Sequence, residues 1–337
     1  MRGFVAGLFL LSGAVIGNPA CAVQVSDVTG GNTADELIKN AEDVYNAMRV
    51  VCSGVSDEIA RVANVAKVNT TISGVGTVAA AGALAVGIKK AATDEEIEGM
   101  ISAFCNGNNN CQNSGDDPDY YNKVIKGLAD IARDAGLADD VDEVENKITQ
   151  VKNLGNWRTG LMGGTVGTNL ATAILSSRNM NQSELIQQIS ACNDMVQQAG
   201  DIVMALKAAG VNPFENSVVG KLDNAKTWCN QIEIADVEKI EKRMKASLGT
   251  SVAGGVIGVA GTATSVAANS DKYTAVEQRV QLSEADRKKV KNLNVAANIM
   301  SGAGVVTGVT GTVLNVSLIS LAKKLMNVAE RCEEVLK

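Results

Sequence analysis

The stretch SVAGGVIGVAGTATSVAAN, residues 251–269, decides how this chain folds. It has no charged and no aromatic side chain, and it contains Gly254, Gly255, Gly258 and Gly261. Each interior glycine costs a helix roughly 1 kcal/mol against alanine, so several glycines at helical spacing call for a compensating contact. Because positions i, i+4 and i+7 share one helix face, Gly254, Gly258 and Gly261 predict a shallow groove against which another helix packs.

The same spacing recurs in other uncharged stretches. The pattern Gly-x-x-x-Gly-x-x-Gly-Thr at 254–262 is repeated at 160–168 and 304–312, and a degraded copy lies at 69–77. We interpret these copies as one helical element used four times. The predicted helix-packing residues are Gly160, Gly164, Gly167, Gly254, Gly258, Gly261, Gly304, Gly308 and Gly311, with Gly76 in the degraded copy. We expect the glycines of 254–261 and of 304–311 to form one antiparallel helix pair.

Helical periodicity surrounds these stretches. Apolar residues recur every three or four positions over 35–67, 120–135, 183–209 and 217–231, and the patterns run into the uncharged stretches without a breaker. Capping signals predict helix starts near Thr33, at Thr93 and at Ser283. No strand pattern of matching strength occurs. The sequence therefore predicts an all-α, elongated multi-helix bundle that forms a single domain over 23–337.

Residues 1–22 read as a secretory signal peptide. Arg2 precedes an apolar run, and Ala20-Cys21-Ala22 forms a cleavage site of the A-x-A type. The mature chain is then expected to begin at Val23; anchoring of Cys21 as a lipoprotein is the less favoured alternative. This predicts an exported protein that is periplasmic, located in the cell envelope or extracellular.

The cysteines support export. After Cys21 is removed, six remain, namely Cys52, Cys105, Cys111, Cys192, Cys229 and Cys332, and an even number in an exported chain predicts disulfides. Cys192 and Cys229 lie at equal distances from the turn at 210–211, so they are level in a helical hairpin and are expected to pair. Cys105 and Cys111 bracket a short polar loop, which leaves Cys52 to pair with Cys332.

The sequence does not decide whether the uncharged stretches lie in a membrane or in a bundle surrounded by water. Residues 68–88, 159–177, 246–270 and 292–322 are 21, 19, 25 and 31 residues long, against the roughly 20 residues that span a bilayer. Basic residues border several of them and Trp157 lies at one edge, which favours membrane helices. Their abundant Gly, Ser, Thr and Asn instead favour a bundle in water. Both alternatives stand at this point.

Composition and motifs exclude several classes of function. The net charge is −6, aromatic residues are 3% and histidine is absent, which disfavours nucleic acid, carbohydrate and histidine-dependent catalysis. Acidic residues at 116–119 resemble a calcium site poorly, and the acidic run at 139–145 is better explained as the start of a helix. The sequence therefore predicts no catalytic, metal or cofactor-binding residues and no cofactor.

The leading functional prediction is a non-enzymatic exported protein that acts through glycine-grooved helix packing. Its expected partner is itself or another helical protein. The alternative is a membrane-inserting or pore-forming helical protein, in which the same stretches assemble in lipid. An enzyme is a third and less favoured class, because no constellation of catalytic side chains is evident.

Overall fold

The computed structural model describes residues 33–107, 119–178 and 182–337. Within these ranges helices are the only regular secondary structure, as predicted, and no strand occurs. The elements are α1 (Ala34–Val51), α2 (Val55–Gly107), α3 (Tyr120–Asp134), α4 (Val141–Arg178), α5 (Gln182–Ala208), α6 (Ser217–Cys229), α7 (Ile234–Ala268), α8 (Asp271–Thr274), α9 (Val276–Val280) and α10 (Glu284–Leu336).

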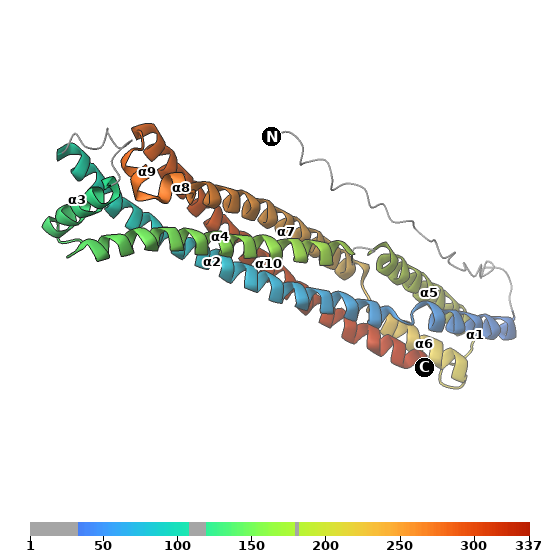
Figure 1. The fold of residues 1–337 in the computed structure, drawn as a ribbon. Helices are drawn as coiled ribbons and strands as arrows, with labels where there is room; N and C mark the ends of the chain where they lie inside the picture. Colours follow the sequence, from blue (N-terminus) through green and yellow to red (C-terminus); the bar gives the residue numbers. More distant parts are fainter. Residues whose placement is uncertain (1–32, 108–118, 179–181) are drawn as a thin grey trace.

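Four long helices, α2, α4, α7 and α10, run side by side along an elongated molecule (Figure 1). Their directions alternate in chain order, and each packs against two others, so that the ring around the bundle axis reads α2, α4, α7, α10. The predicted elongated multi-helix bundle is therefore confirmed. Antiparallel neighbours with this ring order form an up-down-up-down bundle.

One end of the bundle, which we call the disulfide end, consists of α1, α5 and α6 packed on the adjoining parts of α2, α7 and α10 (Figure 1). Its interior is apolar and contains large side chains, among them Leu37, Met48, Ile59, Ile189, Leu206 and Leu325. Thr33 begins α1 with the expected capping box, in which its hydroxyl accepts from the Glu36 amide and Glu36 accepts from the Thr33 amide. This end has the core of an ordinary soluble protein.

The opposite end, which we call the α3 end, packs α3, α8 and α9 against the last part of α2 and the first part of α4. Its separate apolar core includes Ile97, Met100, Ile101, Phe104, Ile125 and Leu128. Ser283 begins α10 as predicted, because its hydroxyl accepts from the Asp286 amide at 3.1 Å. The chain thus has two apolar cores, one at each end of the long helices.

Two predicted helix boundaries were wrong. The helix expected over 35–67 is broken between α1 and α2, where Gly54 takes φ of 81°. Conversely, no helix starts at Thr93; α2 continues through it, and the Thr93 hydroxyl donates to the Lys89 carbonyl one turn earlier. A local capping signal is overruled there because α2 continues to Ile97, Ile101 and the core of the α3 end.

Candidate functional site

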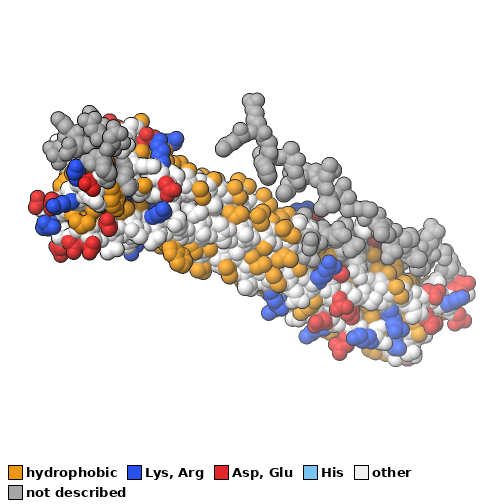
Figure 2. Space-filling model, viewed as in Figure 1, with side chains coloured by type: hydrophobic (Ala, Val, Ile, Leu, Met, Phe, Trp, Pro, Cys, Tyr) orange, Lys and Arg blue, Asp and Glu red, His pale blue; other side chains and the backbone are white. Residues whose placement is uncertain are grey.

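The uncharged stretches 68–88, 159–177, 246–270 and 292–322 lie at the same height in the bundle, and we call them together the uncharged band. Hydrogen bonds between neighbouring helices establish this alignment: Asn69 to Ser176 at 2.9 Å, Thr159 with Ser265 at 3.0 Å, and Ser247 to Asn315 at 3.0 Å. Charged side chains gather at the two ends and leave the middle of the molecule free of charge on the face shown in Figure 2.

The outer surface of the uncharged band is apolar. Sixteen of the 22 large apolar side chains that the structure exposes lie in these stretches, which make up less than a third of the chain. They are Val68, Val75, Val78 and Ile88 on α2, Leu170 and Ile174 on α4, Val252, Val256, Val259 and Val266 on or beside the glycine stretch of α7, and Val295, Ile299, Val306, Val309, Val313 and Val316 on α10. All four helices contribute, so the apolar surface runs around the bundle.

The inside of the uncharged band is small and polar. Its buried residues are glycine, alanine, serine, threonine and asparagine, with Met162 and Leu318 as the only larger apolar ones among the described residues. The buried polar members are Asn69, Ser73, Thr165, Asn169, Thr172, Ser176, Ser247, Ser251, Ser265, Asn294, Ser301 and Asn315. A bundle in water has the opposite arrangement, with large apolar residues inside and polar residues outside.

The glycine faces meet other helices than we expected. On α7, Gly254 lies against Asn169, Gly258 against Val166 and Gly261 against Met162, all of them on α4. On α10, Gly304 lies against Ala80, Gly308 against Thr77 and Gly311 against Ser73, all of them on α2. The predicted antiparallel pair of α7 and α10 does form, and in it Gly261 lies beside Met300 of α10 and Gly311 beside Thr250 of α7. The two glycine faces do not meet each other, so that part of the prediction was wrong. The contribution of these glycines to close packing stays a prediction.

The repeat glycines of α4 point away from the bundle interior, whereas Gly155 on the same helix is buried against Asn269. Gly160, Gly164 and Gly167 are exposed, and a Cβ atom at Gly160 or Gly167 would meet no described atom within 4 Å. The face that α4 buries instead carries Met162, Thr165 and residues at the same helical spacing. The repeat pattern thus predicted the wrong face of this helix, whereas Gly76 in the degraded copy is buried against Thr168.

The threonine that ends each copy of the repeat has the same local role. The hydroxyls of Thr77, Thr168, Thr262 and Thr312 donate to carbonyl oxygens four residues earlier, at Ser73, Gly164, Gly258 and Gly308 respectively, over 2.8–3.1 Å. A hydroxyl bonded in this way needs no partner outside its own helix. This lets a polar residue lie within an apolar helix without an unsatisfied donor.

A group of charged side chains, some buried and some partly exposed, lies where the uncharged band meets the α3 end. Lys90 donates to Asp94 at 2.7 Å, Arg279 pairs with Asp94 at 3.0 Å and with Glu98 at 2.8 Å, and Arg287 pairs with Glu98 at 2.7 Å. Burial lowers the pKa of Lys90, and Arg279 and Arg158 lower it further, whereas Asp94 raises it. This group was not predicted, because its members are far apart in the sequence and Lys90 and Arg158 were interpreted only as flanks of uncharged stretches.

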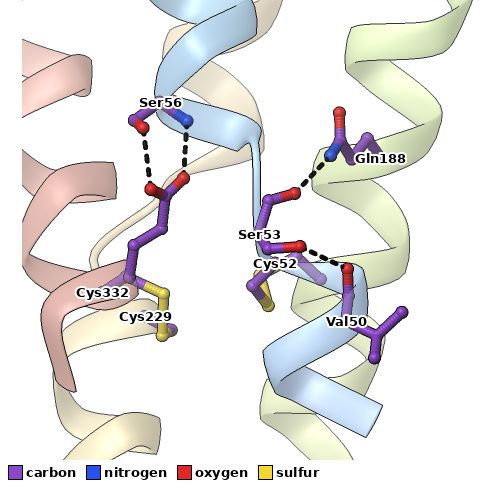
Figure 3. The surroundings of a disulfide bond; sticks show 9 residues. Val50, Cys52, Ser53, Ser56, Gln188, Cys229 and Cys332 are labelled. Carbon is purple, nitrogen blue, oxygen red and sulfur yellow. Dashed lines mark hydrogen bonds between the residues drawn. A yellow bond between two sulfur atoms is a disulfide. The ribbon is translucent and has the colours of Figure 1, made fainter. Parts of the chain in front are cut away.

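The disulfide end contains two adjacent disulfides, which differ from the predicted pairs. Cys52 is bonded to Cys192 and Cys229 to Cys332, with Cα atoms 5.0 and 4.7 Å apart (Figure 3). The predicted pairs Cys192–Cys229 and Cys52–Cys332 were wrong. All four cysteines do meet in one place, since the sulfurs of Cys52, Cys192 and Cys332 lie within 4.8 Å of one another.

Glu333 links the same region to the start of α2. Its carboxylate accepts from the Ser56 amide at 3.0 Å and from the Ser56 hydroxyl at 2.9 Å (Figure 3). At the α3 end, Cys105 is also disulfide-bonded; Cys111, its predicted partner, lies outside the described residues. Disulfide-bonded cysteines therefore occur at both ends of the molecule.

The other acidic candidates from the sequence either lie outside the described residues or begin a helix. Asp116 and Asp117 lie outside the described residues, as does the signal peptide. In the acidic run that begins α4, Asp140 accepts from the Glu143 amide at 2.9 Å and Glu143 accepts from the Asp139 amide at 2.8 Å. These carboxylates cap the start of a helix, which is the role that we expected for them.

By length and composition, three helical segments of the described chain are able to cross a membrane: 34–106, 217–268 and 284–336. They contain the uncharged stretches of α2, α7 and α10, and α4 does not reach the same hydropathy. Comparisons with family models, curated proteins and solved structures find no match to this chain. Any functional argument therefore depends on the chain's own residues.

Proposed function

We propose that this is an exported, non-enzymatic helical protein whose uncharged band lies within a lipid bilayer, with the disulfide end and the α3 end in water on its two sides. The observation that carries the proposal is the reversed arrangement of the band, with valine and isoleucine outside and glycine, serine and asparagine inside. Small residues and polar side chains at helix interfaces are typical of membrane bundles, where lipid replaces water as the solvent.

The distribution of the apolar surface favours lipid over a protein partner. A second protein, or a second copy of this chain, covers one side of a bundle. Exposed apolar residues lie instead on α2, α4, α7 and α10, for example Val78, Ile174, Val256 and Val306. Lipid covers all sides at once. The shorter stretches also have a suitable length, because about 20 helical residues extend across the roughly 30 Å of the hydrocarbon core.

The flanks of the band agree with this proposal. Trp157 is exposed at the edge of the α4 stretch, where an indole ring lies at the level of lipid headgroups. Disulfide-bonded cysteines at both ends require an oxidising compartment for both ends during folding. This favours export of the whole chain before insertion, and the weak hydropathy of α4 fits a segment that does not stop in the first membrane it meets.

Aspartate substitutions on the outside of the band test the proposal. Val256→Asp and Val306→Asp place a carboxylate near the middle of the α7 and α10 stretches, at side chains that are both 66% exposed. Val50→Asp in α1, at a side chain that is 75% exposed, is the matched control at the disulfide end. An acidic or basic residue at the centre of a membrane helix costs about 2.5–3.5 kcal/mol.

The measurement is flotation of the purified oxidised chain with liposomes, followed by extraction at alkaline pH. We expect the unmodified chain and Val50→Asp to float and to resist extraction, and the Val256→Asp/Val306→Asp double variant to remain in the soluble fraction. If instead the unmodified chain stays dispersed without detergent and does not float, the membrane proposal is wrong. Sedimentation then tests self-association in water, the leading prediction from the sequence.

A further inference from the structure

Arg158 is a buried cation without a carboxylate partner among the described residues. It lies on α4 at the edge of the uncharged band and is 1% exposed. Its two terminal nitrogens donate to Asn294 on α10, at 3.1 Å to the backbone carbonyl and 3.5 Å to the side-chain oxygen. Its Nε atom has no hydrogen-bond partner, and Arg158 forms no ion pair with any residue that the structure describes. An unpaired buried guanidinium is strongly unfavourable.

The surrounding carboxylates are already engaged by other cations. Asp94 accepts from Lys90 and from Arg279, and Glu98 accepts from Arg279 and from Arg287. Together with Arg158, the group described above therefore holds four cations and two carboxylates. Burial lowers the pKa of Arg158 to about 10, with Asp94 opposing that shift, so that the guanidinium stays protonated at neutral pH. A bound anion would offset this excess positive charge.

We propose that a small inorganic anion of the halide class, such as chloride, binds in the bundle interior at Arg158 between α2, α4 and α10. The unpartnered Nε atom is one donor. Lys90 and the terminal guanidinium nitrogen of Arg158 both donate to the Asn294 side-chain oxygen, at 3.4 and 3.5 Å, which places the Lys90 ammonium beside the same guanidinium. Electrostatic attraction to two adjacent cations stabilises an anion at this position.

Two further residues shape the site. Gly87 on α2 lies next to the guanidinium, since a Cβ atom there would be 3.1 Å from both Cζ and Nε of Arg158. Asn298 on α10 faces the same glycine, and its buried side-chain oxygen has no hydrogen-bond partner. A half-turn of the Asn298 amide exchanges that oxygen for its NH₂ group, which is a donor to an anion. The site then offers donors from α4 and α10, with the Asn298 amide in the space that Gly87 leaves beside the guanidinium.

Burial determines the size of the ligand. Lys90 and Arg279 are each 2% exposed and Arg158 is 1% exposed, so the phosphate of a lipid, which is attached to acyl chains at the surface, does not reach them. A single buried water is the competing occupant, because it could accept from Nε and donate to Asn298. The anion proposal does not depend on the membrane proposal, since these basic residues lie outside the four uncharged stretches.

Thermal unfolding of the full chain in detergent, followed by tryptophan fluorescence, tests the anion site. Chloride is titrated against gluconate at constant ionic strength, with bromide and sulfate as further arms. We expect chloride and bromide to raise the Tm in a saturable way, by about 5 °C at a concentration one hundred times the Kd. Arg158→Gln should abolish this rise, and Lys291→Gln, an exposed cation at the same edge of the band, should leave it unchanged.

Equal Tm values in chloride and gluconate at every concentration would overturn the proposal and leave water as the occupant. A rise with sulfate but not with chloride would also overturn it, because the ligand would then be an oxyanion. If Arg158→Gln does not fold, the chloride and gluconate titration of the unmodified chain still decides the outcome. A bromide anomalous peak beside Nε of Arg158 in crystals is the direct confirmation, and its absence at saturating bromide contradicts the proposal.

Discussion

The uncharged band and the disulfide end are made from the same long helices, yet they are organised in opposite ways. At the disulfide end, large residues such as Met48 and Ile59 fill the interior and charged residues face outward. In the band, glycine and asparagine lie inside and valine lies outside. The difference shows that one helix can change its buried chemistry along its length without changing its backbone. Under the membrane proposal, the solvent around each region, rather than the helix itself, decides which arrangement is stable.

The disulfides provide the strongest way to separate the two regions. Replacing Cys229 and Cys332 by serine, or Cys52 and Cys192 by serine, removes a link between residues 103 or 140 positions apart. Each loss is expected to cost about 2–5 kcal/mol of unfolding free energy. Hydrogen exchange should show lost protection in α1, α5 and α6 and unchanged protection in the uncharged band, with Ser53→Ala as the control. Equal loss in both regions would mean that they unfold as one unit.

A matched pair of glycines on α10 tests the band itself. A Cβ atom at Gly308 would lie 3.2 Å from the Thr77 Cα atom, whereas at Gly302 it would meet no described atom within 4 Å. Gly308→Ala is therefore expected to destabilise the protein by about 1–3 kcal/mol through overpacking. Gly302→Ala should stabilise it by up to about 1 kcal/mol through helix propensity. Denaturation in detergent measures both, and equal effects would refute a packing role for Gly308.

The smallest effect is expected at Asp236, near the start of α7 in the disulfide end. A hydrogen bond from Lys239 at 2.8 Å, supported by Lys324 at 3.4 Å, lowers the pKa of this carboxyl. A carboxyl group with a lowered pKa in the folded state stabilises the fold at pH values above the ordinary carboxyl pKa. This stabilisation is lost as the pH falls through the lowered pKa. Because both lysines are largely exposed, the contribution is below about 1 kcal/mol.

Comparing the unfolding of Asp236→Asn with that of the unmodified chain measures this contribution. The two free energies should differ at neutral pH and converge as the pH falls through the range in which Asp236 is protonated. Glu238→Gln, at an exposed carboxylate two residues further along the same helix, is the control and should show no such convergence. A constant difference at all pH values for Asp236→Asn would show that Asp236 acts through packing rather than through its charge.

Helix positions were largely predictable, and the exceptions have identifiable causes. Apolar periodicity located α5 and α6 to within a few residues, because burial of one face determines both the pattern and the structure. The break before α2 was missed because the apolar period continues through Cys52 and Val55. Gly54, which has a positive φ at the break, was the residue that could have indicated it. At Thr93, the local capping pattern did not start a new helix, because burial of residues further along α2 favours a continuous helix.

The candidate sites were less predictable, because each depends on the rotation of one helix relative to another. Equal spacing from the turn brought Cys192 and Cys229 into the same cluster of four cysteines but did not establish that they face each other. In α4, glycines and threonines are both small, so the sequence did not indicate which of them is buried. The lack of an ion-pair partner for Arg158 could not be predicted from the sequence either. It depends on how Asp94 and Asn294, which are distant from Arg158 in the sequence, are placed around it.

The sequence by itself determined the helical class, the four uncharged stretches and the presence of disulfides, because these follow from residue types and from spacing along one helix. Only the tertiary structure decided the ring order of α2, α4, α7 and α10, the partners of each glycine face and the pairing of the cysteines. It also decided that polar residues of the band lie inside and valines outside. The physical reason is that burial depends on which helix packs against which, and spacing along a single helix does not specify its neighbours.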